Sequence, residues 1–162
     1  MSFLRLVSKE KDDYYKWNNS ITILKKEDIN YVVLEGNMEN GPAEVIVKGD
    51  KIRWERKMDA IHFQDLLQQL SLDADFCVFT NGAVRVSKVM FVTYYDYFYL
   101  NSSDPKRQAE FVTRVTSGED LYFSYYSEQS EIPNEFKKIC DTLSYGIVDE
   151  ELNTMLLEAE VA

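Results

Sequence analysis

The fold is decided by residues 43–57, AEVIVKGDKIRWERK. The two halves of this stretch are short and rich in residues that favour strands, and Gly49-Asp50 between them favours a tight turn. In the second half, Ile52 and Trp54 alternate with charged residues, as in a strand with one buried and one solvated face. The stretch therefore predicts an antiparallel hairpin.

Similar patterns on both sides of this hairpin predict further strands. Short β-branched runs occur at 20–24 and 30–35. Asn81-Gly82 is a strong hairpin signal between two apolar runs, and a further strand is predicted at 121–126. The run Phe91–Tyr99 holds six aromatic residues in nine positions. We expect it to form a central strand that is covered on both faces.

A change of period after this first group of strands predicts a helix. Within Met58–Leu70, apolar residues recur at i, i+3, i+4 and i+7 and form one stripe: Phe63, Leu66, Leu67 and Leu70. A second helix is expected to start at Ser103-Asp104-Pro105, where a capping residue precedes a proline, and to bury Phe111, Val112 and Val115. Two more helices are predicted at 133–145 and 149–161.

These patterns together predict a single α+β domain over residues 1–162. We expect a mostly antiparallel β-sheet of about six or seven strands with three or four helices packed on it. A chain of 162 residues is long enough for one sizeable core.

Charge is distributed unevenly along the chain, whose net charge is −10. From Gly118 to Ala162 there are eleven acidic residues and two basic ones, Lys137 and Lys138. A field of one sign repels nucleic acid and acidic membranes and attracts a basic partner. We therefore expect no direct contact with nucleic acid or membrane. With no signal peptide and no CxxC spacing, the chain is expected to be cytoplasmic.

The sequence lacks the residue patterns of the common enzyme classes. His62 is the only histidine, which excludes histidine pairs, and neither GxSxG nor a phosphate-binding glycine loop is present. Asp59, His62 and Asp65 would spread over roughly 120° of a helix, too wide for one tetrahedral metal ion. We expect no catalytic residue, no metal and no cofactor, and a protein that is not an enzyme.

The leading hypothesis is an acidic binding protein that neutralises or regulates a basic protein partner. In size, charge and composition the chain resembles bacterial immunity proteins, which neutralise a basic nuclease or other toxin. This resemblance matches no family motif and assigns no residues. On charge and aromatic content alone, the partner-binding residues are expected in one stretch: Glu119, Asp120, Tyr125, Tyr126, Glu128, Glu131 and Glu135.

The alternative hypothesis is a small-molecule-binding domain. Its aromatic-lined cavity would lie around the Phe91–Tyr99 strand, lined by Tyr94, Tyr95, Asp96 and Tyr97. Asp96 interrupts an otherwise apolar strand. A carboxylate there would point to the open edge of the strand, pair with a basic residue or line the pocket, and structural pairing is the commonest of these roles. A homodimer formed through a sheet edge is compatible with both hypotheses.

Overall fold

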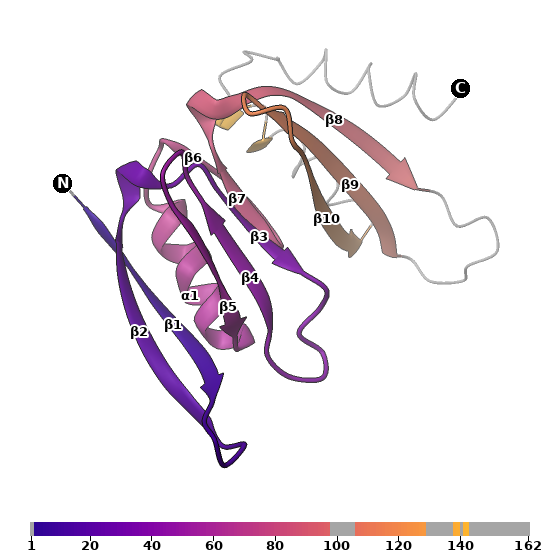
Figure 1. Ribbon diagram of the computed structural model, residues 1–162. Helices are drawn as coiled ribbons and strands as arrows, with labels where there is room; N and C mark the ends of the chain where they lie inside the picture. Colours follow the sequence, from indigo (N-terminus) through magenta and orange to yellow (C-terminus); the bar gives the residue numbers. More distant parts are fainter. Residues whose placement is uncertain (1, 98–105, 129–137, 140, 143–162) are drawn as a thin grey trace. The chain divides into compact units, whose positions relative to one another are not determined.

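The computed structural model describes residues 2–97, 106–128, 138, 139, 141 and 142 (Figure 1). For residues 94–97, 106–109 and 124–128 only the backbone is described. The chain divides into two compact units, Met1–Lys88 and Val89–Ala162, and each is considered by itself. The single domain expected from the chain length stays a prediction.

The first unit is a seven-stranded antiparallel sheet with the order β2-β1-β5-β4-β3-β7-β6 (Figure 1). Helix α1, Ala60–Ser71, connects β5 to β6 and packs against β1, β6 and β7. The strands are β1 Phe3–Lys11, β2 Trp17–Lys25, β3 Tyr31–Glu35, β4 Ala43–Lys48, β5 Arg53–Met58, β6 Phe76–Phe79 and β7 Gly82–Arg85. Two short 3-10 helices, η1 Lys26–Asp28 and η2 Val86–Lys88, follow β2 and β7.

The core of this unit lies between the sheet and α1. Alternate side chains of each strand point to the same face, and one face of the sheet supplies the strand residues of this core. The helix contributes Phe63, Leu66, Leu67 and Leu70, which confirms the predicted apolar stripe. The strands contribute Leu4, Leu6, Val32, Val45, Val47, Trp54, Met58, Phe76 and Ala83.

Two hairpins predicted from turn residues are confirmed. Strands β4 and β5 pair in register from Lys48 opposite Arg53 onward, and β6 pairs with β7 across the turn before Gly82. The loop of the first hairpin is longer than the predicted two-residue turn. It runs from Gly49 to Ile52, and the Gly49 N–H donates a hydrogen bond to the Ile52 carbonyl (3.0 Å).

The predicted α+β domain with three or four helices is wrong. The described residues form ten strands in two antiparallel sheets, and α1 is their one helix of full length. The helices predicted at 133–145 and 149–161 lie outside the described residues, apart from Lys138, Ile139, Asp141 and Thr142, which are helical.

The helix predicted to start at Ser103-Asp104-Pro105 and to bury Phe111, Val112 and Val115 is also wrong, because Lys106–Val115 is a strand, β9. Phe111, Thr113 and Val115 are buried, and the residues between them are partly exposed, which is the period of a strand. The same apolar residues fit a helical stripe equally well. β-branched side chains favour the strand, and its pairing partners on both sides decide the outcome.

The second unit contains a three-stranded antiparallel sheet with the order β10-β9-β8. β10, Asp120–Glu128, confirms the strand predicted at 121–126. A turn containing Gly118, whose φ is +91°, joins β9 to β10. Phe111 and Phe123 stand opposite each other and are buried.

The aromatic strand predicted to be central is instead an outer strand of this sheet. It forms β8, Val89–Tyr97, and pairs with β9 alone among the described strands. Met90 is 59% exposed and Phe91 44% exposed, so the start of the strand is not covered on both faces. A continuous aromatic run is therefore no proof of a central position here.

Candidate functional site

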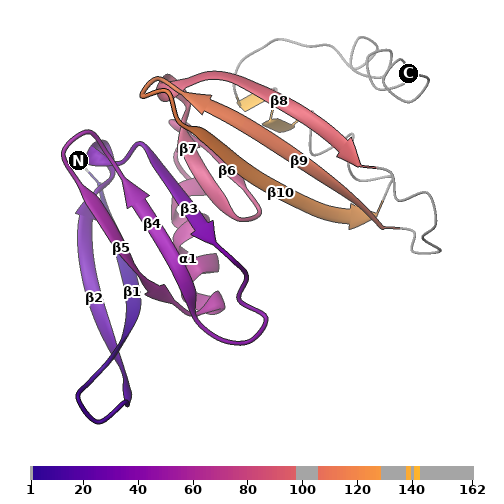
Figure 2. The ribbon, with the colours of Figure 1, turned by 45° about the vertical axis from the view of Figure 1, so that its right-hand side comes forward.

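The hairpin of β1 and β2 projects from the first unit. In both ribbon views it continues past α1 and past the ends of β4 and β5 (Figure 1, Figure 2). An unbroken ladder pairs the strands from Phe3 opposite Lys25 to Lys11 opposite Trp17. The connecting turn, Asp12–Lys16, therefore lies at the end of a regular support and away from the core.

Hydrogen bonds to Asp12 fix this turn. Its carboxylate accepts bonds from the backbone N–H of Tyr14 (2.9 Å) and Lys16 (3.0 Å) and from the side-chain amide of Asn18 (3.1 Å). Its backbone N–H donates to the Lys16 carbonyl (2.9 Å), and its carbonyl accepts from the Tyr15 N–H (3.0 Å). The bonds to the carboxylate, first that from Lys16, hold the pKa of Asp12 below its usual value.

Two tyrosine rings extend from the turn into solvent. Tyr14 is 84% exposed and Tyr15 is 82% exposed. Tyr15 also has a φ of 61°, and it is the one non-glycine residue with a positive φ in the described part of the chain. This left-handed conformation is unfavourable for a bulky side chain, whereas Asn, Asp and Gly adopt it more readily. Because the Tyr15 ring is in solvent, its packing does not offset the cost of this backbone conformation.

Trp17 extends the aromatic surface onto the start of β2. Its ring is 39% exposed, with Lys11 Nζ 4.9 Å and Lys57 Nζ 5.8 Å from the ring centroid. Lys57 reaches the ring because β5 pairs with β1 at Lys9 and Lys57. Cation–π contacts at exposed sites contribute about 0.5–1 kcal/mol each. We call Tyr14, Tyr15 and Trp17 the hairpin tip.

Apolar side chains also lie in solvent along the two strands. Phe3 is 52%, Ile21 59% and Ile23 57% exposed. All three belong to the set of alternate residues that points away from α1, since their neighbours Leu4 and Leu24 pack in the core. Exposed apolar side chains that adjoin one another are typical of interaction surfaces.

Three carboxylates meet on the same sheet, from β3, β4 and β5. Oxygens of Glu35, Glu44 and Glu55 all lie within 4.8 Å of one another. A hydrogen bond between Glu44 and Glu55 raises the pKa of Glu44 and lowers that of Glu55. Such oxygens can hold a hard cation such as Ca²⁺. Glu55 already pairs with Arg53 (3.2 Å), however, and we propose no metal site there.

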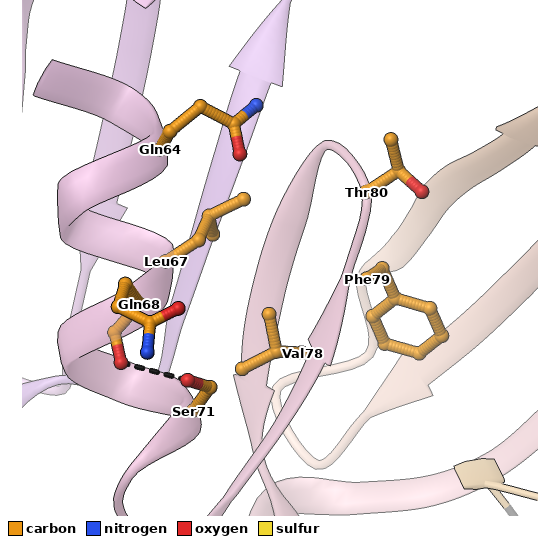
Figure 3. A pocket seen from close by; sticks show the side chains of 7 residues that line it. All are labelled: Gln64, Leu67, Gln68, Ser71, Val78, Phe79 and Thr80. Atoms are coloured by element: carbon orange, nitrogen blue, oxygen red, sulfur yellow. Dashed lines mark hydrogen bonds between the residues drawn. The ribbon is translucent and has the colours of Figure 1, made fainter. Parts of the chain in front are cut away.

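A cavity of about 310 Å³ lies between α1 and the β6–β7 hairpin (Figure 3). The Ser71 hydroxyl on its helix side donates a hydrogen bond to the Gln68 carbonyl (2.7 Å). The lining residues are neutral or apolar, so they bring no charged acid or base to the cavity. They are Gln64, Leu67, Gln68, Ser71, Val78, Phe79 and Thr80.

The acidic residues predicted to bind a partner begin at the β9–β10 turn. Glu119 is half-buried there, and its carbonyl accepts a bond from the Val115 N–H (3.0 Å). Asp120 forms a two-pronged ion pair with Arg114, with Nη2 and Oδ2 2.9 Å apart. The bonds from Arg114 keep the pKa of Asp120 low. The charge of Asp120 is thus already balanced within the sheet.

The other predicted site residues are placed by the backbone or lie outside the described part of the chain. Tyr125, Tyr126 and Glu128 belong to β10, whereas Tyr94–Tyr97, with Asp96, belong to β8. Because β9 separates these strands, the two groups occupy opposite outer strands. Glu131 and Glu135 lie outside the described residues. Both hypotheses built on these residues stay predictions.

The hairpin tip was not predicted from the sequence. No strand was predicted at Phe3–Lys11, although Leu4 and Leu6 alternate there with polar or exposed residues. The turn at Asp12 was not predicted either, although aspartate favours a side-chain bond to the backbone two residues further on. The approach of Lys57 to Trp17 has no signal in sequence, because it depends on the pairing of β1 with β5.

No family model, curated protein or solved structure matches this chain. In the part of the chain that the structure describes, no helix combines the length and the apolar character needed to cross a membrane. A functional hypothesis must therefore come from the geometry of the chain itself.

Proposed function

We propose that this chain is a protein-binding module and that the hairpin tip is its main contact with the partner. The observation that carries the proposal is Tyr15, whose bulky side chain is held in a left-handed backbone conformation with its ring in water. Unfavourable conformations of this kind cluster at functional sites. Tyr14 and Trp17 add two more exposed rings beside it.

The chemistry and the rigidity of the tip suit protein recognition. Tyrosine and tryptophan supply large contact areas at a small loss of conformational entropy, and they dominate interface hot spots. Because Asp12 fixes the turn, binding would not require the backbone to become ordered. Lys11 and Lys57 beside Trp17 favour a partner with acidic groups around an apolar pocket.

Replacing Tyr15 by asparagine tests this proposal without disturbing the fold. Asparagine tolerates a positive φ better, so Tyr15→Asn is expected to fold with equal or higher stability. Loss of the ring is expected to weaken partner binding about 30-fold, the effect of one hot-spot residue. The partner is recovered from native cells on the immobilised full chain and identified by mass spectrometry. Calorimetry with the purified partner then gives both Kd values.

Tyr122→Asn is the matched control, because Tyr122 is another exposed tyrosine (58%) but belongs to β10 in the second unit. It is expected to bind with wild-type affinity. A folded Tyr15→Asn variant that binds every recovered partner as tightly as the wild type would contradict the proposal.

A second candidate function is the neutralisation or regulation of a basic protein partner, such as a toxin domain, in the cytoplasm and without catalysis. The charge of the two units favours it. Residues 89–162 contain fourteen acidic and five basic residues, against fourteen and thirteen in residues 1–88. An acidic field of this strength speeds association with a basic surface. In this function the contacts would come from the second unit.

Salt and charge reversal distinguish the second function from the first. Association with a purified basic nuclease domain is expected to weaken steeply as ionic strength rises. Reversing Glu119 and Glu128 together to lysine is expected to slow association by about tenfold, measured by stopped-flow fluorescence. Tyr15→Asn is expected to leave this rate unchanged. A rate that depends on neither salt nor the reversed charges would exclude the second function.

A further inference from the structure

Strand β2 is an outer strand of the seven-stranded sheet, and among the described strands it pairs with β1 alone. It extends over nine residues, Trp17–Lys25, and its ladder with β1 has no bulge. An outer strand of this length offers a row of backbone donors and acceptors to another strand. Natural sheets usually block such an edge with lysine, proline or a bulge. From Trp17 to Leu24, β2 contains neither lysine nor proline.

The ends of the ladder show which backbone groups of β2 face outward. The Lys16 carbonyl accepts the Asp12 N–H (2.9 Å), and the Lys26 N–H donates to the Ser2 carbonyl (3.1 Å). In an antiparallel pair, every second residue bonds to its partner. The even-numbered residues of β2 therefore bond to β1. The outward N–H and C=O groups belong to Trp17, Asn19, Ile21, Ile23 and Lys25.

We propose that β2 pairs antiparallel with β2 of a second copy of this chain, about a two-fold axis through Ile21. With that axis, each Ile21 faces the Ile21 of the second copy. Asn19 then faces Ile23, and Trp17 faces Lys25. Every outward-facing residue of one strand meets an outward-facing residue of the other, which satisfies about ten backbone hydrogen bonds. An axis displaced along the strand leaves some of these groups unpaired.

The side chains of this register complement one another. The outward-facing residues are also those whose side chains point away from α1, so Ile21 and Ile23 of both copies would form one apolar strip. At each end of the strip, Lys25 of one copy would lie beside the exposed Trp17 ring of the other, as a cation–π pair. Lys11 and Lys57 already approach the Trp17 ring, so Lys25 of the second copy would be the third ammonium group around it. The edge is thus self-complementary in hydrogen bonding and in apolar contact.

This dimer goes beyond the proposed function, because it uses the edge of β2. It shares Trp17 with the hairpin tip but does not use the rings of Tyr14 and Tyr15. The dimer and the proposed partner binding can therefore be tested independently of each other. Tyr15→Asn is expected to form the same dimer as the wild type, whereas its partner binding is expected to fall. Dimerisation is read from the purified chain alone and needs no partner.

Sedimentation equilibrium of the full chain tests the dimer. The wild type is expected to associate reversibly to a dimer at micromolar concentration, and Ile21→Lys to stay monomeric because it opposes two lysines at the axis. Ile61→Lys is the matched control: Ile61 is 73% exposed on α1, and this variant is expected to dimerise as the wild type does. Circular dichroism confirms that each variant is folded. A wild type that stays monomeric up to about 100 μM would overturn the proposal and leave the edge to another protein's strand.

Cysteine cross-linking tests the register. Opposed residues of a bonded antiparallel pair have Cα atoms about 5.5 Å apart, within the range of a disulfide. Ile21→Cys is expected to form a covalent dimer on mild oxidation. Ile23→Cys is equally exposed, but it faces Asn19 of the second copy, so it is expected to cross-link no more than the wild type does. Equal cross-linking by both variants, or by neither, would overturn the two-fold pairing at Ile21.

Discussion

Gly49→Ala is expected to destabilise the first unit by about 3 kcal/mol or more, a larger effect than alanine at Gly36, Gly41 or Gly118. A Cβ at Gly49 would lie 1.7 Å from the carbonyl oxygen and 2.9 Å from the carbonyl carbon of Asp28. Both are backbone atoms at the end of η1, so they cannot rotate away as a side chain would. The Gly49 N–H also holds the β4–β5 loop through Ile52. Relief of the clash would therefore separate η1 from that loop.

Tryptophan fluorescence in a urea titration measures this loss in the first unit specifically, because both tryptophans, Trp17 and Trp54, belong to it. Gly36→Ala is the matched control. Gly36 has a φ of +80°, and no atom lies within 4 Å of the position that an alanine methyl would take there, so strain alone should cost about 1 kcal/mol. If the two alanine variants unfold at the same urea concentration, the close approach of Asp28 to Gly49 is incorrect.

Phe63→Ala is also expected to destabilise the first unit strongly, by about 3–5 kcal/mol. Phe63 is 2% exposed and lies on the buried stripe of α1, opposite the strands of the core. Alanine favours helix more than phenylalanine does, so the loss would come from packing and the cavity left behind. The same urea titration measures it.

Ile61→Ala provides the control on the same helix. Ile61 is 73% exposed, and its truncation is expected to change stability by no more than about 0.5 kcal/mol. Comparable losses from the two variants would contradict the assignment of the buried face of α1.

Local patterns predicted the elements whose period was unambiguous. The stripe from Phe63 to Leu70 and the turns before Arg53 and Gly82 depend on neighbours within one or two turns of chain. The errors arose where one pattern fits two structures. Residues 106–115 satisfy both a helical stripe and a strand, and the pairing of β9 with two other strands decides between them.

The candidate site was harder to predict than the fold, because side-chain exposure and backbone conformation distinguish it, and amino-acid composition reveals neither. Tyr14 and Tyr15 are two of eleven tyrosines in the sequence. Their exposure and the positive φ of Tyr15 are visible only once the turn is folded. Charge alone predicted Asp120 as a partner-binding residue, but Arg114 lies opposite it in the register of β9 and β10 and forms an ion pair with it.

The Asp12 carboxylate accepts hydrogen bonds from the Tyr14 and Lys16 N–H groups and from the Asn18 side chain, and backbone bonds complete the turn. None of these bonds uses the side chain of residue 14 or 15. The support and the recognition surface of the hairpin are therefore encoded at different positions. In evolutionary terms, the two traits are separable: substitutions at 14 and 15 can change the partner while selection on Asp12 preserves the turn. The same separation makes this hairpin a natural scaffold for displaying short binding sequences.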